Sequence, residues 1–262
     1  MLFTVLLSCM LAGCSAPSVQ TTAPKGYHLV WKDEFNTSKH SLPSHQWWYE
    51  TGDKGWGNHE LENYVKAVNG NDTCALVSDG TLKIVARPSS GKVCSVRMNT
   101  NKSWKYGYFE AKMKLPGGLG TWPAFWMMPK NNKSWPHDGE IDIMEEVGLN
   151  PNNIHCTIHC GAYNHVLGTQ KGTAKLIPDA EQAFHVYAVE WTPDYIKGFI
   201  DGELYFSFDN DHTGNHETWP FDAPFYLKLN LAWGGDWGGS KGVDPSALPA
   251  TFVIDYVRVY QK

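Results

Sequence analysis

Several features are absent from this chain, and each absence argues against a class of function. Its 22 lysine and arginine residues do not cluster and the net charge is −5, which argues against nucleic acid as a partner. No CxxC pair is present, so the sequence offers no zinc motif. From Tyr27 onward there is no long amphipathic helix, internal repeat or shift in composition. What remains is one strand-rich domain.

The apolar run at the N-terminus is too short to cross a bilayer. It reads MLFTVLLSCMLAGCSAPS, and such a run ending in small residues predicts a signal peptide. Its LAGC segment resembles a bacterial lipobox, which implies that residues 1–14 are a signal ending in a lipidated Cys14. Residues 15–26 are rich in Pro, Ser and Thr and predict a flexible tether. We expect an exported bacterial lipoprotein at the outer membrane or cell surface, bound to the membrane through this lipid.

The remaining cysteines follow Tyr27. In an exported protein a disulfide between Cys74 and Cys94 is possible, and the sequence leaves it open. Cys156 and Cys160 are four residues apart in a predicted strand, roughly 13 Å at the rise of a strand, which is too far for a disulfide. Their alternation with polar residues predicts that they are small core residues.

Strand patterns recur at short intervals through residues 27–262. Examples are ALVSDGTLKIVA, KYGYFEAKMKL, FHVYAVEWT, YIKGFIDGELYFSF and TFVIDYVRVY. Asp-Gly pairs inside two of these segments predict tight hairpin turns. Many antiparallel strands over this length indicate a single all-β domain, a β-sandwich or jelly roll.

Tryptophan is unusually abundant, with twelve residues. Indole rings are large and need a partner for their N–H group, so about half of them can be assigned to a core. The others predict a surface or groove rich in flat aromatic faces, for which sugars are natural partners.

One strand combines acidic and aliphatic residues in the segment HDGEIDIMEEVG. In a regular strand Glu140 and Asp142 would share one face, and Glu145 would turn toward the aliphatic face. One extra residue reverses this, so we expect a β-bulge around Ile143–Met144 that returns Glu145 to the acidic face.

Crowded carboxylates raise one another's pKa, so the group cannot be fully ionised at neutral pH. One protonated carboxyl beside one ionised carboxylate is the pair that glycoside hydrolysis requires. The spacing alone is equally compatible with a calcium cluster or a solvated acidic edge.

Beyond these patterns, the sequence resembles glycoside hydrolase family 16, in particular its laminarinase-like members. The resemblance rests on GEIDIME with its extra residue, and on LVWKDEF, GWGNHELENY, GYFEAKMKLPGGLGTWPAFWMMP, HCTIHCGAYN, PFYLKLNLAWGGDWGG and IDYVRVYQ. It implies a concanavalin-like jelly roll with the substrate cleft on its concave sheet. It also implies that Glu140 is the nucleophile, Asp142 its assisting neighbour and Glu145 the acid/base. Glu146 is expected to face away, as a surface charge or a salt-bridge partner.

Candidate cleft residues come from alternation and from the resemblance. In TWPAFWMM, alternation places Trp122 and Trp126 on one face and Phe125 and Met127 on a core face. The resemblance implies that Trp135 stacks on sugar and that His159 contacts sugar or tunes the acids. It further implies substrate contacts from Asn58, Glu60 and Arg97. Trp233 and Trp237 belong to the Gly-rich loop AWGGDWGG, which is expected to wrap one end of the cleft, and both are predicted to contact the substrate there. Trp233 is expected to narrow one end of the cleft.

The family often carries a structural calcium away from the cleft. The matching positions are Glu34, the carbonyl of Gly80 and Asp255, and oxygen ligands of this kind suit calcium. No cofactor is expected in catalysis. The function implied is a monomeric retaining endo-β-glucanase that cleaves β-1,3-glucans, mixed-linkage β-1,3/1,4-glucans or both. A non-catalytic β-glucan-binding module and a transglycosylase are the alternatives.

Overall fold

Alternation of apolar and polar residues produces strands along most of the chain in this computed structural model, which describes residues 21–37 and 39–262. Within these residues one sheet has ten strands, in the order β17 (Glu203–Asp209), β16 (Tyr195–Ile200), β15 (His185–Trp191), β10 (Gly107–Lys114), β19 (Ala250–Gln261), β7 (Thr81–Ser89), β8 (Lys92–Ser95) and β3 (Asn63–Tyr64), with β1 (His28–Asp33) on β19 and β6 (Ala75–Ser78) on β7. The other has seven, in the order β14 (Lys171–Leu176), β13 (Asn153–His159), β12 (Glu140–Glu145), β11 (Thr121–Pro129), β18 (Phe225–Trp233), β9 (Arg97–Thr100) and β2 (Trp47–Glu50). The hairpin of β4 (Val68–Asn69) and β5 (Asp72–Thr73) and the 3₁₀ helix η1 (Pro245–Ala247) complete the elements.

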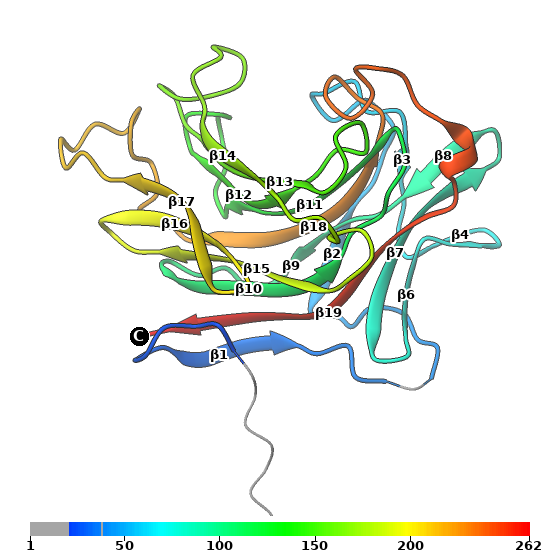
Figure 1. The fold of residues 1–262 in the computed structure, drawn as a ribbon, viewed down its shortest axis with the longest axis horizontal. Coiled ribbons are helices and arrows are strands. Elements are labelled where there is room, and N and C mark those ends of the chain that lie inside the picture. Colours follow the sequence, from blue (N-terminus) through cyan, green and yellow to red (C-terminus); the bar gives the residue numbers. More distant parts are fainter. Residues whose placement is uncertain (1–20, 38) are drawn as a thin grey trace, which may run out of the picture.

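The two sheets pack face to face and curve together, as Figure 1 shows. We call the seven-stranded sheet the cleft sheet and the ten-stranded sheet the outer sheet. Nearly all strand pairs are antiparallel, with β3 and β8 as a parallel exception. The predicted all-β sandwich of jelly-roll type is confirmed.

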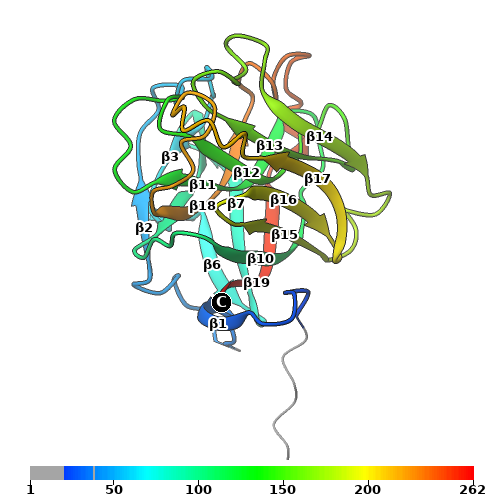
Figure 2. The same cartoon turned by 90° about the vertical axis from the view of Figure 1, so that its left-hand side faces the viewer.

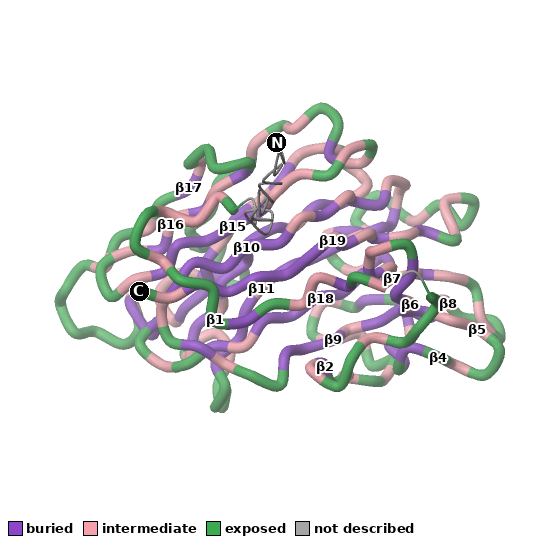
Figure 3. The backbone as a smooth tube through the Cα atoms, turned by 90° about the horizontal axis from the view of Figure 1, so that it is seen from below, coloured by how far each residue is buried: buried purple, intermediate pink, exposed green. Residues whose placement is uncertain are grey.

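The core lies between the sheets, where one face of each strand is apolar. Phe125 and Met127 of β11 are fully buried there, opposite outer-sheet residues such as Phe109 and Ile254. Figure 3 shows that the buried segments concentrate on central strands, including β10, β19, β11 and β18. The predicted core positions of Cys156 and Cys160 are confirmed, since both side chains are fully buried. This packing fixes which face of each cleft-sheet strand points away from the core.

The register of the cleft sheet aligns its outward-facing residues in rows across the strands. One row joins Glu145, Ala124, Asn230, Arg97 and Glu50, from β12 to the edge strand β2. The adjacent row joins the following residues: Asp142, Trp126, Lys228, Asn99 and Trp48. Acidic, aromatic and basic side chains from five strands are thereby brought onto one surface.

A β-bulge interrupts β12 where the sequence predicts it. Asp142 pairs with Thr157 and Glu145 pairs with His155, so Ile143 and Met144 together lie opposite one residue of β13. Both of these side chains are fully buried in the core, which leaves Glu145 on the same face as Asp142. The predicted bulge is confirmed.

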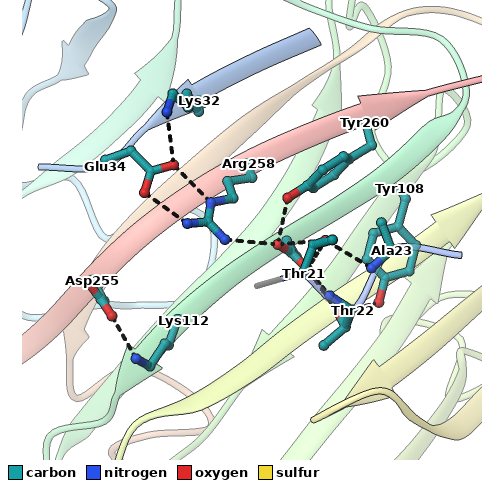
Figure 4. Close-up of polar contacts among 11 residues, drawn as sticks. Thr21, Thr22, Ala23, Lys32, Glu34, Tyr108, Lys112, Asp255, Arg258 and Tyr260 are labelled. Atoms are coloured by element: carbon teal, nitrogen blue, oxygen red, sulfur yellow. Dashed lines mark hydrogen bonds and ion pairs between the residues drawn. The ribbon is translucent and has the colours of Figure 1, made fainter. Parts of the chain in front are cut away.

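The start of the described chain is bound to the outer sheet, on the side away from β12 and β13 (Figures 1 and 2). The fully buried Glu110 carboxylate accepts hydrogen bonds from Thr22 Oγ1 at 2.8 Å, Thr22 N at 3.1 Å and Tyr260 Oη at 3.0 Å. Thr21 and Thr22, predicted to belong to a flexible tether, are thus held by a buried acceptor, and Ala23 N donates in turn to Thr21 Oγ1. Figure 4 shows Thr21, Thr22 and Ala23 at this place. The predicted signal, Cys14 and residues 15–20 lie outside the described residues. Within the described residues no helix has the length and apolar character needed to span a membrane.

Candidate active site

A cleft of about 360 Å³ lies on the outward face of the cleft sheet. It is lined by Trp56, Gly57, Asn58, Glu60, Arg97, Trp122, Ala124, Trp126, Met128, Trp135, Glu140, Glu145, His165, Val166, Asn230 and Ala232. Aromatic walls with a few converging carboxylates are typical of a site for a small polar ligand. The cleft therefore contains two of the three predicted acids, and Asp142 is buried between them on β12.

Two indole groups orient the outer carboxylates of the cluster. Trp122 Nε1 donates to Glu145 Oε1 at 2.9 Å, and Trp135 Nε1 donates to Glu140 Oε2 at 2.8 Å. Each acid therefore keeps its other oxygen for a ligand, and its rotamer is fixed by a rigid donor. The sequence predicts both tryptophans in the cleft as substrate contacts, but it gives no sign of their hydrogen bonds to the two acids.

The environment of the acids favours protonation. Burial, followed by repulsion from the adjacent Asp142 carboxylate, raises the pKa of Glu140 to about 8. Burial also raises the pKa of Asp142 to about 7, and burial followed by repulsion from Asp142 raises that of Glu145. At neutral pH the cluster therefore retains protons, so an acid and an ionised carboxylate can coexist within it.

His159 lies beside the acids, as predicted from the sequence. Its Nε2 is 3.3 Å from Asp142 Oδ2, and it is 7% exposed. One carboxylate oxygen each of Glu140 and Asp142 and one ring nitrogen of His159 lie within 4.8 Å of one another. His155, by contrast, packs its ring against Trp237 at 4.9 Å, and burial lowers its pKa.

One loop residue of the site carries no signal in the sequence. His165 lines the cleft, and its ring lies 5.0 Å from that of Trp135 and 5.2 Å from that of His159. The buried Asn164 fixes the loop, because its side chain donates to Cys160 O at 3.1 Å and accepts from Leu167 N at 3.1 Å. An irregular loop has no periodicity that would place His165 over the acids.

Arg97 lies in the cleft wall with two aromatic neighbours. Its guanidinium is 4.7 Å from the ring centre of Trp56 and 4.8 Å from that of Trp126. Its Nε pairs with Glu50 Oε2 at 2.5 Å, and the same oxygen pairs with Lys228 Nζ at 2.7 Å. The sequence predicted Arg97 at the site, but it gave no sign of the buried Lys228 beside it.

Asn58 and Glu60 both line the cleft, as predicted, and they belong to one hydrogen-bond chain. Asn58 Nδ2 donates to Glu60 Oε1 at 3.2 Å, and Tyr64 Oη donates to Glu60 Oε2 at 2.9 Å. Asn230 Nδ2 donates to Tyr64 Oη at 3.0 Å and its Oδ1 accepts from Trp126 Nε1 at 2.7 Å. Trp126 is therefore held in place by polar groups beneath it.

The two tryptophans of the Gly-rich loop differ from expectation. Trp233 is 3% exposed and is not a cleft residue, because it continues the core-facing alternation of Leu229 and Leu231 in β18. It therefore cannot narrow the cleft directly. Trp237 lies next to the cleft wall, with its ring 5.4 Å from that of Trp122, and supports that residue.

Glu146 also differs from expectation. The residue is fully buried and accepts a hydrogen bond from the backbone N–H of Asn152, so it is neither a surface charge nor a salt-bridge partner. Burial raises its pKa to about 8, which keeps it protonated at neutral pH. Its buried position follows from the bulge, which also moves the residue after Glu145 to the core side.

The residues predicted to bind calcium do not fit an ion in the arrangement shown in Figure 4. Glu34 forms a two-pronged pair with Arg258, from Nε to Oε1 and from Nη2 to Oε2, both at 2.9 Å. Asp255 pairs with Lys112 at 2.8 Å. Gly80 lies by a shallow hollow with Asn36, Thr37 and Asp79. Since both carboxylates already have cationic partners, the calcium site stays a prediction without support from this geometry.

The buried thiols of Cys74 and Cys94 lie side by side, with their sulfur atoms 2.8 Å apart and unbonded. The fold would therefore permit a disulfide between Cys74 and Cys94 on oxidation. The sequence left this disulfide open.

Comparison with known proteins gives consistent matches. A sequence profile of the Glycosyl hydrolases family 16 matches residues 61–258. A β-glucanase from Rhodothermus marinus is 47% identical over 274 residues, covering 99% of this chain and 93% of that protein. The solved laminarinase from Rhodothermus marinus is 48% identical with a TM-score of 0.84, covering 90% of this chain and 97% of that one. The solved SCLam, a non-specific endo-β-1,3(4)-glucanase, is 45% identical with a TM-score of 0.85, covering 92% and 93% respectively.

Proposed function

Because the chain belongs to glycosyl hydrolases family 16, we propose that Glu140, Asp142 and Glu145 form the catalytic centre of an endo-β-glucanase. The protein is a glycoside hydrolase of β-1,3-glucans, mixed-linkage β-1,3/1,4-glucans or both. The observation that carries the assignment is the acidic cluster itself. A bulged strand holds three carboxyl groups with raised pKa values at an aromatic cleft, an arrangement that costs stability and has no use in a simple binding module.

The reaction follows a double displacement in this proposal. The reactive form is the fraction of the enzyme in which Glu140 is ionised and Glu145 is protonated. In this form Glu140 attacks the anomeric carbon while Glu145 donates its proton to the departing glycosidic oxygen. The resulting glycosyl ester on Glu140 is then hydrolysed by water, whose proton Glu145 accepts. Asp142 is buried between them and lies next to His159. Its negative charge raises the pKa of both Glu140 and Glu145, and so favours the state in which one of them keeps its proton. These steps use only groups of this chain and need no cofactor.

A transglycosylase would form the same intermediate and pass it to a sugar acceptor instead of water. The cleft geometry suits both outcomes, and product analysis distinguishes them. The β-glucanase from Rhodothermus marinus and the endo-β-1,3(4)-glucanase SCLam, which this chain resembles at 47% and 45% identity, carry the names of hydrolases, and this favours water as the acceptor.

Substrate range provides the test of the proposed function. We expect the protein to release reducing ends from laminarin and from barley β-glucan, with cleavage at the bond that follows a 3-linked glucose, and to leave cellulose intact. The measurement is the initial rate on the three polymers, with chromatography of the products. Cleavage of cellulose, or activity confined to galactans such as agarose, would contradict this assignment.

We further propose that the protein is a lipoprotein attached through Cys14, on the basis of the LAGC segment. We expect Cys14→Ala to move the protein from the membrane fraction to the soluble fraction with its activity retained, because Cys14 precedes in sequence the residues 61–258 that match the family. Fractionation and mass spectrometry of the N-terminal peptide provide the measurement. An unlipidated wild-type protein in the membrane fraction would contradict the proposal.

A further inference from the structure

One tryptophan on the edge strand of the cleft sheet is exposed to solvent. Trp48 of β2 is 40% exposed, and it is more exposed than any other tryptophan among the described residues. Burial of a large indole ring would stabilise the folded state, so its exposure is unfavourable for stability. Such a residue is informative when it lies next to a binding surface.

Strand alternation places Trp48 on the same face as the cleft. Its neighbour Trp47 is buried in the core, so Trp48 and Glu50 point to the opposite side of β2. Glu50 confirms this direction, because it pairs with Arg97, a residue of the cleft wall. Trp48 itself lies outside the cleft lining, and therefore beyond Arg97 as seen from the acids.

A continuous series of contacts connects Trp48 with the cleft. The Lys228 ammonium lies 4.8 Å from the ring centre of Trp126 and 5.2 Å from that of Tyr226. The Tyr226 ring in turn lies 6.0 Å from that of Trp48. Lys228 is fixed by hydrogen bonds to Glu50 Oε2 and Asn99 Oδ1, both at 2.7 Å. The surface from Trp126 to Trp48 is therefore aromatic, and buried polar groups keep it rigid.

The row from Asp142 to Trp48 crosses four strand spacings, roughly 19 Å at about 4.8 Å each. This length exceeds one sugar ring, so a glucan seated at the acids and directed along the row would reach β2. There it would meet an exposed indole face and the part-exposed Glu50 carboxylate, whose side chain is 21% exposed. A flat apolar face beside a hydrogen-bond acceptor is the combination that a pyranose ring requires.

We propose that Trp48 and Tyr226, with Glu50 at their side, form a distal subsite that binds one glucosyl residue of a chain extending from the cleft toward β2. This proposal rests on the proposed function, because its occupant is the same β-glucan. Continuity with the cleft favours a sugar over a protein partner, since the aromatic surface begins at Trp126 in the cleft wall and ends at Trp48 on the edge strand. The subsite makes the enzyme prefer longer chains.

The experiment compares β-1,3-gluco-oligosaccharides from the trisaccharide to the heptasaccharide. In the wild type, kcat/KM is expected to rise at the length that first occupies the distal subsite. In Trp48→Ala the ratio of kcat/KM for the heptasaccharide to that for the trisaccharide is expected to fall about fivefold to tenfold, as for loss of one aromatic contact. Trp48→Phe, which keeps a flat ring, is expected to retain most of this ratio.

Leu204→Ala serves as the matched control, because Leu204 is 51% exposed on β17 of the outer sheet, outside the cleft. Thermal unfolding of each variant identifies any loss of fold. If Trp48→Ala does not fold, the length ratio of Trp48→Phe still tests the proposal, because this variant keeps an aromatic ring. An active enzyme with the wild-type length ratio in Trp48→Ala would overturn the subsite alone. A wild-type chain that cleaves none of the oligosaccharides or polymers would overturn the proposed function and the subsite with it.

Discussion

Replacement of Glu140 or Glu145 by Gln is expected to reduce turnover of β-glucan by ~10³-fold or more while the fold is preserved. Gln keeps the shape and can still accept the indole hydrogen bonds from Trp135 and Trp122, but it can neither attack the anomeric carbon nor transfer a proton. Initial rates on laminarin and circular dichroism of each variant provide the measurement.

Added azide distinguishes the nucleophile, Glu140, from the acid/base, Glu145. In Glu145→Ala, with a substrate that carries an activated leaving group, azide should enter the glycosyl–Glu140 intermediate and restore turnover, giving a β-glycosyl azide. The matched control is Glu146→Gln, since Glu146 is an adjacent buried carboxyl that is protonated at neutral pH and lies outside the cleft. Its activity should stay near that of the wild type. Near-normal rates in both Glu140→Gln and Glu145→Gln would remove the basis for the mechanism.

Glu50→Ala is expected to lower the free energy of unfolding by about 3 kcal/mol, or Tm by roughly 6–12 °C. Glu50 is the carboxylate that both Arg97 and Lys228 contact, and these cations are 13% and 1% exposed. Burial opposes ionisation of Glu50, yet the two cations outweigh it and hold its pKa below the usual range. Its removal leaves two buried positive charges without their shared partner. Thermal unfolding followed by circular dichroism measures the effect.

The pH dependence of the stability loss in Glu50→Ala tests whether unpaired buried charges cause it. Burial and the nearby Arg97 lower the pKa of Lys228 to about 7, so above pH 7 the folded wild type already carries a neutral lysine. The difference in stability between wild type and Glu50→Ala should therefore be large at pH 5 and shrink toward pH 9, where only Arg97 lacks its partner. Asp53→Ala removes an exposed ion pair with Lys92 and should leave Tm almost unchanged. A loss that is the same at pH 5 and pH 9 would contradict the electrostatic explanation.

The bulge in β12 shows what a sequence can predict in this protein. Strand alternation is a local rule, so the failure of Glu145 to fit it was visible in six residues and pointed to an inserted residue. The same rule separated Trp126 from Phe125 correctly. It also applies to Trp233, which belongs to the alternation of Leu229 and Leu231; there the expectation came from the Gly-rich loop that follows and was wrong.

Long-range partners are the part that the sequence could not reveal. Lys228 stands among leucines in LKLNL, and its burial depends on Glu50, which is 178 residues away. His165 reaches Trp135 only because a loop closes over the acids. Glu146 was expected at the surface because a charged residue usually costs too much to bury. Its protonated state removes that cost, and the pKa shift depends on the folded environment.

The hydrogen bonds that hold Thr21 and Thr22 to Glu110 also determine how the molecule is presented to large substrates. They fix the first described residues on the outer sheet, whereas the residues that line the cleft belong mainly to the cleft sheet and its loops, and the cleft sheet forms the other side of the sandwich (Figure 1). Any support joined through the N-terminal end would therefore stand behind the enzyme, with the acids directed outward. A glucan in a particle or gel, too bulky to enter a gap between enzyme and support, could then lie across the cleft without steric hindrance.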